Sequence, residues 1–162
     1  MGSRSAARPG LPIHRRRPAL RQILDFQPDP AAIASACAEP LPPFVRRGVE
    51  LFNKGEYFEA HEVLEEAWRQ ERRPVRELYR VILQAAVACY KLKTGNYNGF
   101  IKMVARLRTW AAPFPDNCQG IHLAKLLNNI DQLEAQVIAH GPENISTMNF
   151  SSLAHVELLE EQ

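Results

Sequence analysis

Residues 52–74 read FNKGEYFEAHEVLEEAWRQERRP, and this stretch holds one helix between two breaks. Gly55 is suited to end the apolar segment before it, and Pro74 is suited to the first turn of the segment after it. Between them, residues 57–72 repeat apolar side chains with helical spacing. These apolar residues fall on one broad face: Ala60, Val63, Leu64, Ala67 and Trp68. The stretch therefore predicts an amphipathic helix that packs between a preceding and a following helix.

The rest of the chain shows the same succession of helical segments and breaks. A Pro-rich approach at residues 29–43 precedes five predicted helices, at residues 44–55, 57–72, 74–93, 97–112 and 121–140. No segment shows the sustained alternation of a β-strand. We therefore predict an all-α fold, a compact antiparallel bundle of about five helices arranged as two helical hairpins plus a leading helix. The third of these helices is apolar almost all round, which predicts that it is central.

The predicted organisation has three parts. Residues 1–39 form a basic, Pro-rich leader and approach segment that we expect to be disordered. Residues 40–141 form the helical domain, and residues 142–162 form a weakly structured tail. A length of 162 residues suits one domain with a core of its own.

A short repeat indicates how the helices are connected. Gly55 and Tyr57 recur 40 residues later as Gly95 and Tyr97, and each copy joins the end of one helix to the start of an amphipathic one. A spacing near 40 residues is typical of stacked helical hairpins. Asn96 is expected to cap the helix that follows the second copy.

Charge is unevenly distributed along the chain. Residues 1–24 carry six arginines and no acidic residue, which leaves 14 basic and 18 acidic side chains in residues 25–162. This balance excludes a broad nucleic-acid footprint on the domain itself, whereas the basic head is suited to contact nucleic acid or anionic lipid. The head has no apolar stretch of signal-peptide length, and no run in the sequence reaches the ~20 apolar residues of a membrane span.

The cysteines give no pairing signal. Cys37, Cys89 and Cys118 are odd in number and form no CxxC motif, so we predict neither a disulfide framework nor a zinc site. Unpaired cysteines and the lack of a signal peptide favour a cytoplasmic location. An organellar location, directed by the Arg-rich head, is the alternative.

The candidate site lies on the helix at residues 57–72. His61 and Glu65 are four residues apart, so their side chains meet, at the border between the apolar face and the solvated one. The solvated face carries Glu59, Glu62, Glu66 and Arg69. Such a pair suits a ligand-binding or acid–base site, two ligands of a divalent metal, or a structural contact in which the carboxylate orients the imidazole. A zinc-protease helix would have a second histidine at position 65, so the metal is the weaker hypothesis.

A polar stripe on the central helix supplies neighbours for this pair. It consists of Glu77, Arg80, Gln84 and Lys91. If the two helices are antiparallel about Arg73, His61 lies level with Gln84, because they are twelve residues before and eleven residues after the turn. By the same count Glu65 lies level with Arg80. The alternative is that the stripe faces solvent.

Arg108 lies among apolar positions of the helix at residues 97–112. An arginine in such surroundings needs a carboxylate, for which we expect Glu65. The alternative is a side chain that extends along the rim of the bundle to solvent.

The segments FNKGEYFEAHEVLEEAWR, LYRVILQAAVACYKLKTGN and GFIKMVARLR, in this order, resemble the bacterial DUF309 proteins. The resemblance covers roughly residues 44–112 and implies a small all-helical domain with no established biochemical role. It also leads us to expect a histidine where this chain has Lys91, a difference that weakens the metal hypothesis. The family's motif positions correspond here to Phe52, Gly55, Glu59, His61, Glu62, Glu65, Trp68, Arg69, Gln84, Gly95 and Asn96.

These features predict a domain that binds a small ligand or a protein partner at a polar cluster around His61, Glu65 and Gln84. The alternative is a hydrolase-like enzyme that uses Glu65 and His61 as an acid–base pair, with or without a divalent metal. The sequence identifies neither a cofactor nor an oligomeric state. The candidate ligand-binding residues are His61, Glu65, Trp68, Arg69, Arg80, Gln84 and Arg108.

Overall fold

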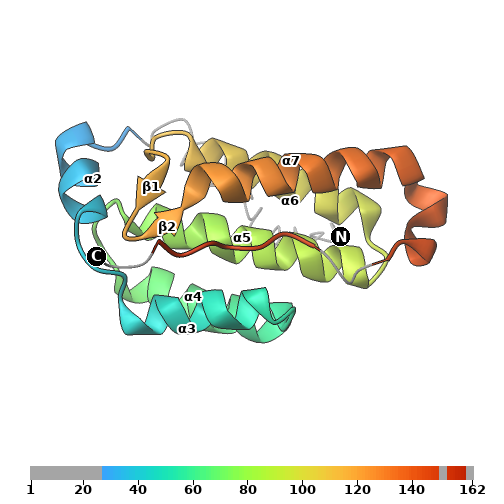
Figure 1. Cartoon of the computed structure of the whole chain (residues 1–162), viewed down its shortest axis with the longest axis horizontal. Coiled ribbons are helices and arrows are strands. Elements are labelled where there is room, and N and C mark those ends of the chain that lie inside the picture. Colours follow the sequence, from blue (N-terminus) through green and yellow to red (C-terminus); the bar gives the residue numbers. More distant parts are fainter. Residues whose placement is uncertain (1–26, 150–152, 160–162) are drawn as a thin grey trace, which may run out of the picture.

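The computed structural model describes residues 27–149 and 153–159, and within them the all-α prediction is confirmed (Figure 1). The helices are α2 (Pro30–Cys37), α3 (Pro43–Asn53), α4 (Tyr57–Gln70), α5 (Arg76–Lys93), α6 (Tyr97–Ala111), α7 (Leu123–His140) and the 3-10 helix η1 (Pro142–Thr147). Two short strands, β1 (Asn117–Cys118) and β2 (Ile121–His122), form an antiparallel hairpin between α6 and α7. The basic head, residues 1–24, lies outside the described residues.

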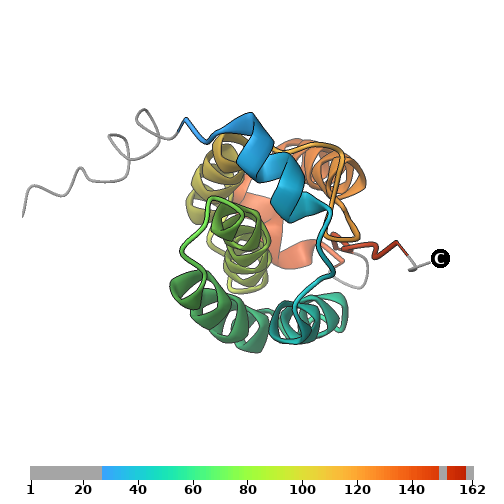
Figure 2. The same ribbon diagram turned by 90° about the vertical axis from the view of Figure 1, so that its left-hand side faces the viewer.

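Helix α5 is the central helix of the bundle. It packs against both α4 and α6, and α3 packs on α4 (Figures 1 and 2). Its fully buried side chains include Tyr79, Ile82 and Leu92. A helix with neighbours on several sides needs apolar residues around most of its circumference, which is the pattern that the sequence shows.

The Gly-x-Tyr repeat marks two helix ends of the same geometry. Gly55 and Gly95 have φ angles of 79° and 78°, a left-handed backbone that glycine adopts at little cost. In both copies the residue after the glycine donates its N–H to the carbonyl five residues earlier, at 3.0 and 2.8 Å. Asn96 also accepts a hydrogen bond from the N–H of Gly99 at 2.8 Å, which confirms its predicted capping role.

A glycine also lets α3 and α4 approach each other closely. A Cβ atom on Gly48 would lie 2.6 Å from Cγ of Leu64, which is buried in the core between the two helices. A larger residue at position 48 would therefore force the helices apart.

The segment before the bundle is more ordered than predicted. Residues Pro30–Cys37 form α2, which crosses one end of the bundle (Figure 2). Asp29 caps this helix by accepting a backbone N–H at 3.0 Å, and Ile33 and Ala36 are buried. The expectation of disorder is therefore wrong for α2. The sequence carries only a weak helical signal here, because the helix is short and flanked by prolines. Its stability depends on contacts with distant parts of the chain.

Cys37 and Cys118 form a disulfide bond between α2 and β1, so the prediction of unpaired cysteines is wrong for these two. They are 81 residues apart, and only the packing of α2 against the hairpin brings them together. Cys89 is free and buried in the core. The cysteines therefore no longer indicate a reducing compartment.

The tail is packed against the bundle where it is described. After η1, residues 153–159 run back along the molecule toward the hairpin (Figure 1). The side-chain amide of Asn53 donates to the carbonyl of Val156 and accepts its N–H, both at 2.8 Å. Leu158 forms an isolated antiparallel bridge with Ile121. In the described part of the chain, no helix combines the length and apolar character needed to cross a membrane.

Candidate functional site

The candidate site lies along the α4–α5 seam, the line of contact between these two antiparallel helices. Two ring contacts across it pair Phe58 with Tyr90 and Trp68 with Arg80, and His61 and Val87 line one pocket between them. In each pair the two residue numbers add to 148. Residues equally far before and after Arg73 would have numbers that add to 146, so the observed pairing is shifted by two positions.

The side-chain direction explains this offset. Side chains of a helix lean toward its N-terminus by about one residue position, and in antiparallel helices the two leans add. From this offset we infer that Gln84 lies nearer the level of Leu64 and Glu65 than that of His61. Arg80 is level with Trp68, not with Glu65.

His61 and Glu65 contact each other as predicted. Nε2 of His61 lies 3.3 Å from Oε2 of Glu65, and their side chains are 32% and 31% exposed. The other carboxylate oxygen of Glu65 accepts a hydrogen bond from Arg69 at 2.5 Å. The three side chains form a polar row along one edge of α4. Glu62 and Glu66 are exposed, as the helical pattern predicted.

An apolar pocket of about 160 Å³ opens beside His61 and is lined by Tyr57, Phe58, Val87 and Tyr90; we call it the seam pocket. Phe58 and Tyr90 are 48% and 42% exposed, and their ring centroids lie 5.7 Å apart. Sequence reasoning missed these aromatic residues. The available signal was Phe58 itself, a large apolar side chain outside the buried face of α4.

Further along the seam, Arg80 lies between two tryptophan rings. Its guanidinium carbon is 4.5 Å from the ring centroid of Trp68 and 3.9 Å from that of Trp110. Arg76 covers Trp68 as well, at 4.3 Å. Because these aromatic rings come from α4 and α6, the arginine of α5 joins three helices through cation–π contacts. Trp110 was not among the predicted site residues.

Glu77 pairs with Arg80 inside this cluster. Their Oε2 and Nε atoms lie 2.8 Å apart, and the side chains are 8% and 14% exposed. Burial raises the pKa of the Glu77 carboxyl and lowers the pKa of the Arg80 guanidinium, while the attraction between the two groups opposes both shifts. This part of the predicted polar stripe is therefore enclosed by neighbouring helices and does not face solvent.

Gln84 lies one helical turn beyond Arg80. Its Oε1 atom is buried and accepts no hydrogen bond from the described residues. An unpaired acceptor in such surroundings costs about 1–3 kcal/mol, so a donor supplied by a bound group would stabilise it.

Arg108 belongs to a different part of the molecule, and its expected pairing with Glu65 is wrong. Its guanidinium donates to Asp131 at 2.7 Å and to Glu134 at 2.8 Å, both on α7. Arg108 therefore joins α6 to α7. The reason is that α6 turns this side chain away from α4, a relationship that the sequence pattern of a single helix does not contain.

The described residues include no group of three or more His, Cys, Asp or Glu side chains placed to hold a metal ion. His61 and Glu65 together supply two ligands. A divalent metal at this point would need further ligands from another group, since protein zinc sites use three or four.

The part of the chain that contains the α4–α5 seam is similar to a known protein family. Residues 45–103 match a family model described as "Domain of unknown function (DUF309)". This segment is similar to the DUF309 family. The matched segment begins in α3 and ends in α6, so it contains the whole of α4 and α5. Trp110, the β1–β2 hairpin and α7 lie beyond the matched segment.

A curated relative extends the similarity without naming an activity. An uncharacterized protein of Aquifex aeolicus (strain VF5) is 31% identical to this chain over 94 residues. The aligned region is 57% of this chain and 28% of the relative, so the chain spans little more than a quarter of that protein's length.

Proposed function

We propose that the segment similar to DUF309 binds a protein partner along the α4–α5 seam, with an apolar side chain of the partner in the seam pocket. The observation that carries this proposal is the pair of exposed aromatic rings, Phe58 and Tyr90, on the two sides of an apolar pocket. Aromatic residues around a desolvated pocket commonly supply most of the binding energy of a protein interface.

The size of the seam pocket favours a side chain over a free metabolite. Small-molecule sites usually measure about 300–1,000 Å³. The seam pocket, at about 160 Å³, is close to the ~150 Å³ of an engineered apolar cavity that binds benzene. It therefore admits one aromatic or branched side chain.

The rim of the seam pocket indicates the character of the rest of the partner. His61 and Glu65 lie next to the pocket, and the exposed face of α4 adds Glu59, Glu62 and Glu66. Such a rim favours a partner that carries a basic residue near its apolar anchor, because complementary charge speeds association and fixes orientation.

Selection from a random peptide library displayed on phage tests this proposal. The full chain is the bait, and bound peptides are then measured against Phe58→Ala and Tyr90→Ala. Ile138→Ala is the matched control, because Ile138 is a 55% exposed apolar residue on α7, away from the seam.

We expect enriched peptides to share an aromatic or branched anchor beside a basic residue. Each seam substitution should weaken their binding about 30-fold, the effect of losing an interface residue worth about 2 kcal/mol. The Ile138 variant should bind like the wild type. Peptides that bind both seam variants unchanged would show that the partner surface lies elsewhere.

The His61–Glu65 contact also favours a second function, acid–base catalysis in a hydrolase-like enzyme. The contact orients the imidazole and leaves both groups accessible to a substrate. Hydrolysis of p-nitrophenyl acetate provides a general probe. If His61 is the catalytic base, His61→Ala should lower the hydrolysis rate about 100-fold or more. His140→Ala, a control at the exposed end of α7, should leave the rate unchanged. Equal rates for all three proteins would exclude this function.

A further inference from the structure

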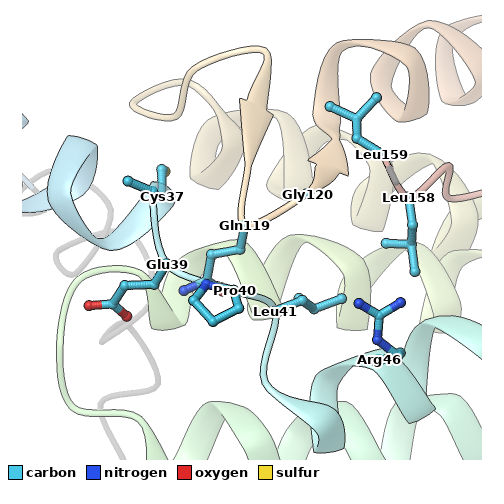
Figure 3. A pocket seen from close by; sticks show the side chains of 10 residues that line it. Cys37, Glu39, Pro40, Leu41, Arg46, Gln119, Gly120, Leu158 and Leu159 are labelled. Atoms are coloured by element: carbon cyan, nitrogen blue, oxygen red, sulfur yellow. The ribbon is translucent and has the colours of Figure 1, made fainter. Parts of the chain in front are cut away.

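A second pocket lies beside the disulfide, near the start of α3. It has a volume of about 310 Å³, within the range of small-molecule sites. We call it the hairpin pocket. Figure 3 shows that four segments meet around it: the chain after α2, α3, the β1–β2 turn and the tail. Its lining residues are Cys37, Ala38, Glu39, Pro40, Leu41, Arg46, Gln119, Gly120, Leu158 and Leu159.

Several bonds hold the walls of the hairpin pocket in place. Cys37 is joined to Cys118 by the disulfide, and its carbonyl accepts the N–H of Gln119 at 2.8 Å. Gln119 is 2% exposed, and its side chain accepts the hydroxyl of Tyr79 at 2.9 Å. On the other wall, the N–H of Leu159 donates to the turn at 2.6 Å. The pocket is therefore formed in advance of binding, which lowers the entropic cost of a ligand.

The two charged side chains that line the hairpin pocket, Glu39 and Arg46, point in different directions. Glu39 turns its carboxylate away from the pocket, where both oxygens accept hydrogen bonds from Arg73 at 2.7 and 3.0 Å (Figure 3). Arg46 instead directs its guanidinium toward the space between Leu41 and Leu158 (Figure 3). Within the described residues, this guanidinium makes no ion pair or hydrogen bond. The pocket thus presents one cationic group beside the apolar side chains of Leu41 and Leu158.

We infer that the hairpin pocket binds a small organic acid, with its carboxylate on Arg46 and its hydrocarbon part against Leu41 and Leu158. A planar guanidinium matches a carboxylate with two parallel hydrogen bonds. The leucines remove the hydrocarbon part from water. The inference does not depend on the seam, which lies on α4 and α5.

Binding of octanoate to the full chain, measured by isothermal titration calorimetry, tests this inference. Octanol is the matched uncharged probe. Arg46→Gln removes the cation but keeps a polar side chain, and Arg47→Gln is the control, because Arg47 is an exposed neighbour on α3 that does not line the pocket. Amide chemical shifts locate the ligand independently of affinity.

We expect octanoate to bind at least tenfold more tightly than octanol. Arg46→Gln should weaken octanoate about tenfold or more and leave octanol unchanged, while Arg47→Gln should change neither. The largest amide shifts should fall on Leu41, Gly120 and Leu158.

Three results would overturn the inference. The first is the absence of octanoate binding in the wild type. The second is an equal loss of affinity in the two arginine variants. The third is binding that appears only after residues 160–162 are removed, which would assign the pocket to the end of the chain itself.

Discussion

The guanidinium carbon of Arg80 lies 3.9 Å above the ring centroid of Trp110, and its Nε atom lies 2.8 Å from the carboxylate of Glu77. We predict that Arg80→Met lowers the free energy of unfolding by about 3 kcal/mol, because it leaves a buried carboxylate without its partner. Urea denaturation at neutral pH measures this change. The double variant with Glu77→Leu should recover part of the loss, since it removes both charges. A loss below about 0.5 kcal/mol in the single variant would show that the cluster is unimportant for stability.

The pH dependence of stability should contain a contribution from Glu77. Burial raises the pKa of this carboxyl above its value of about 4.3 in the unfolded chain. Between these two values the folded protein binds more protons than the unfolded one, so the contribution of Glu77 becomes less favourable as pH rises. Stability of the wild type should therefore fall relative to that of Glu77→Gln between about pH 4 and pH 7. Denaturation curves at both pH values decide this, and a relative gain by the wild type would contradict the direction of the shift.

Glu62, Glu65 and Glu66 of α4 should differ in their effect on stability. Glu65 contacts both His61 and Arg69, so Glu65→Ala should cost about 1 kcal/mol, the sum of two modest helix-surface pairs. Glu62→Ala and Glu66→Ala should each cost less than about 0.5 kcal/mol, because both residues are exposed. Chemical denaturation of the three variants gives the comparison. Equal costs would mean that the row from His61 to Arg69 does not form in solution.

The disulfide should stabilise the protein considerably. A link between residues 81 positions apart removes about 4 kcal/mol of chain entropy from the unfolded state. The paired variant Cys37→Ser with Cys118→Ser should therefore melt about 10 °C lower than the oxidised wild type. Calorimetry with and without a reducing agent measures the same difference. Cys89→Ala is the control, and a reducing agent should lower its melting temperature as much as that of the wild type.

The five main helices, α3 to α7, could be predicted from sequence because each carries local signals. Gly55 and Gly95 end their helices through backbone conformations that few other residues adopt easily, and the periodicity of α4 defines its buried face. The His61–Glu65 contact followed from helical geometry alone. These features can be predicted without knowing how the helices pack against one another.

Relationships between helices were the part that sequence could not supply. Counting from Arg73 ignored the lean of the side chains, which shifts the pairing of α4 and α5 by about two residue positions. Arg108 met α7 instead of α4, and Cys37 met Cys118, through packing that has no local pattern. The seam pocket was missed for the same reason, since Phe58 and Tyr90 come together only when α4 and α5 are paired.

The most direct test of the proposed partner surface is a two-dimensional amide NMR titration of the full chain with a peptide selected on it. If the peptide binds the seam, the largest shifts map to the seam pocket, around Phe58, His61, Val87 and Tyr90, and Tyr90→Ala strongly reduces them at the same peptide concentration. Shifts centred on α7 or on the hairpin pocket, with the seam unchanged, would contradict the proposal.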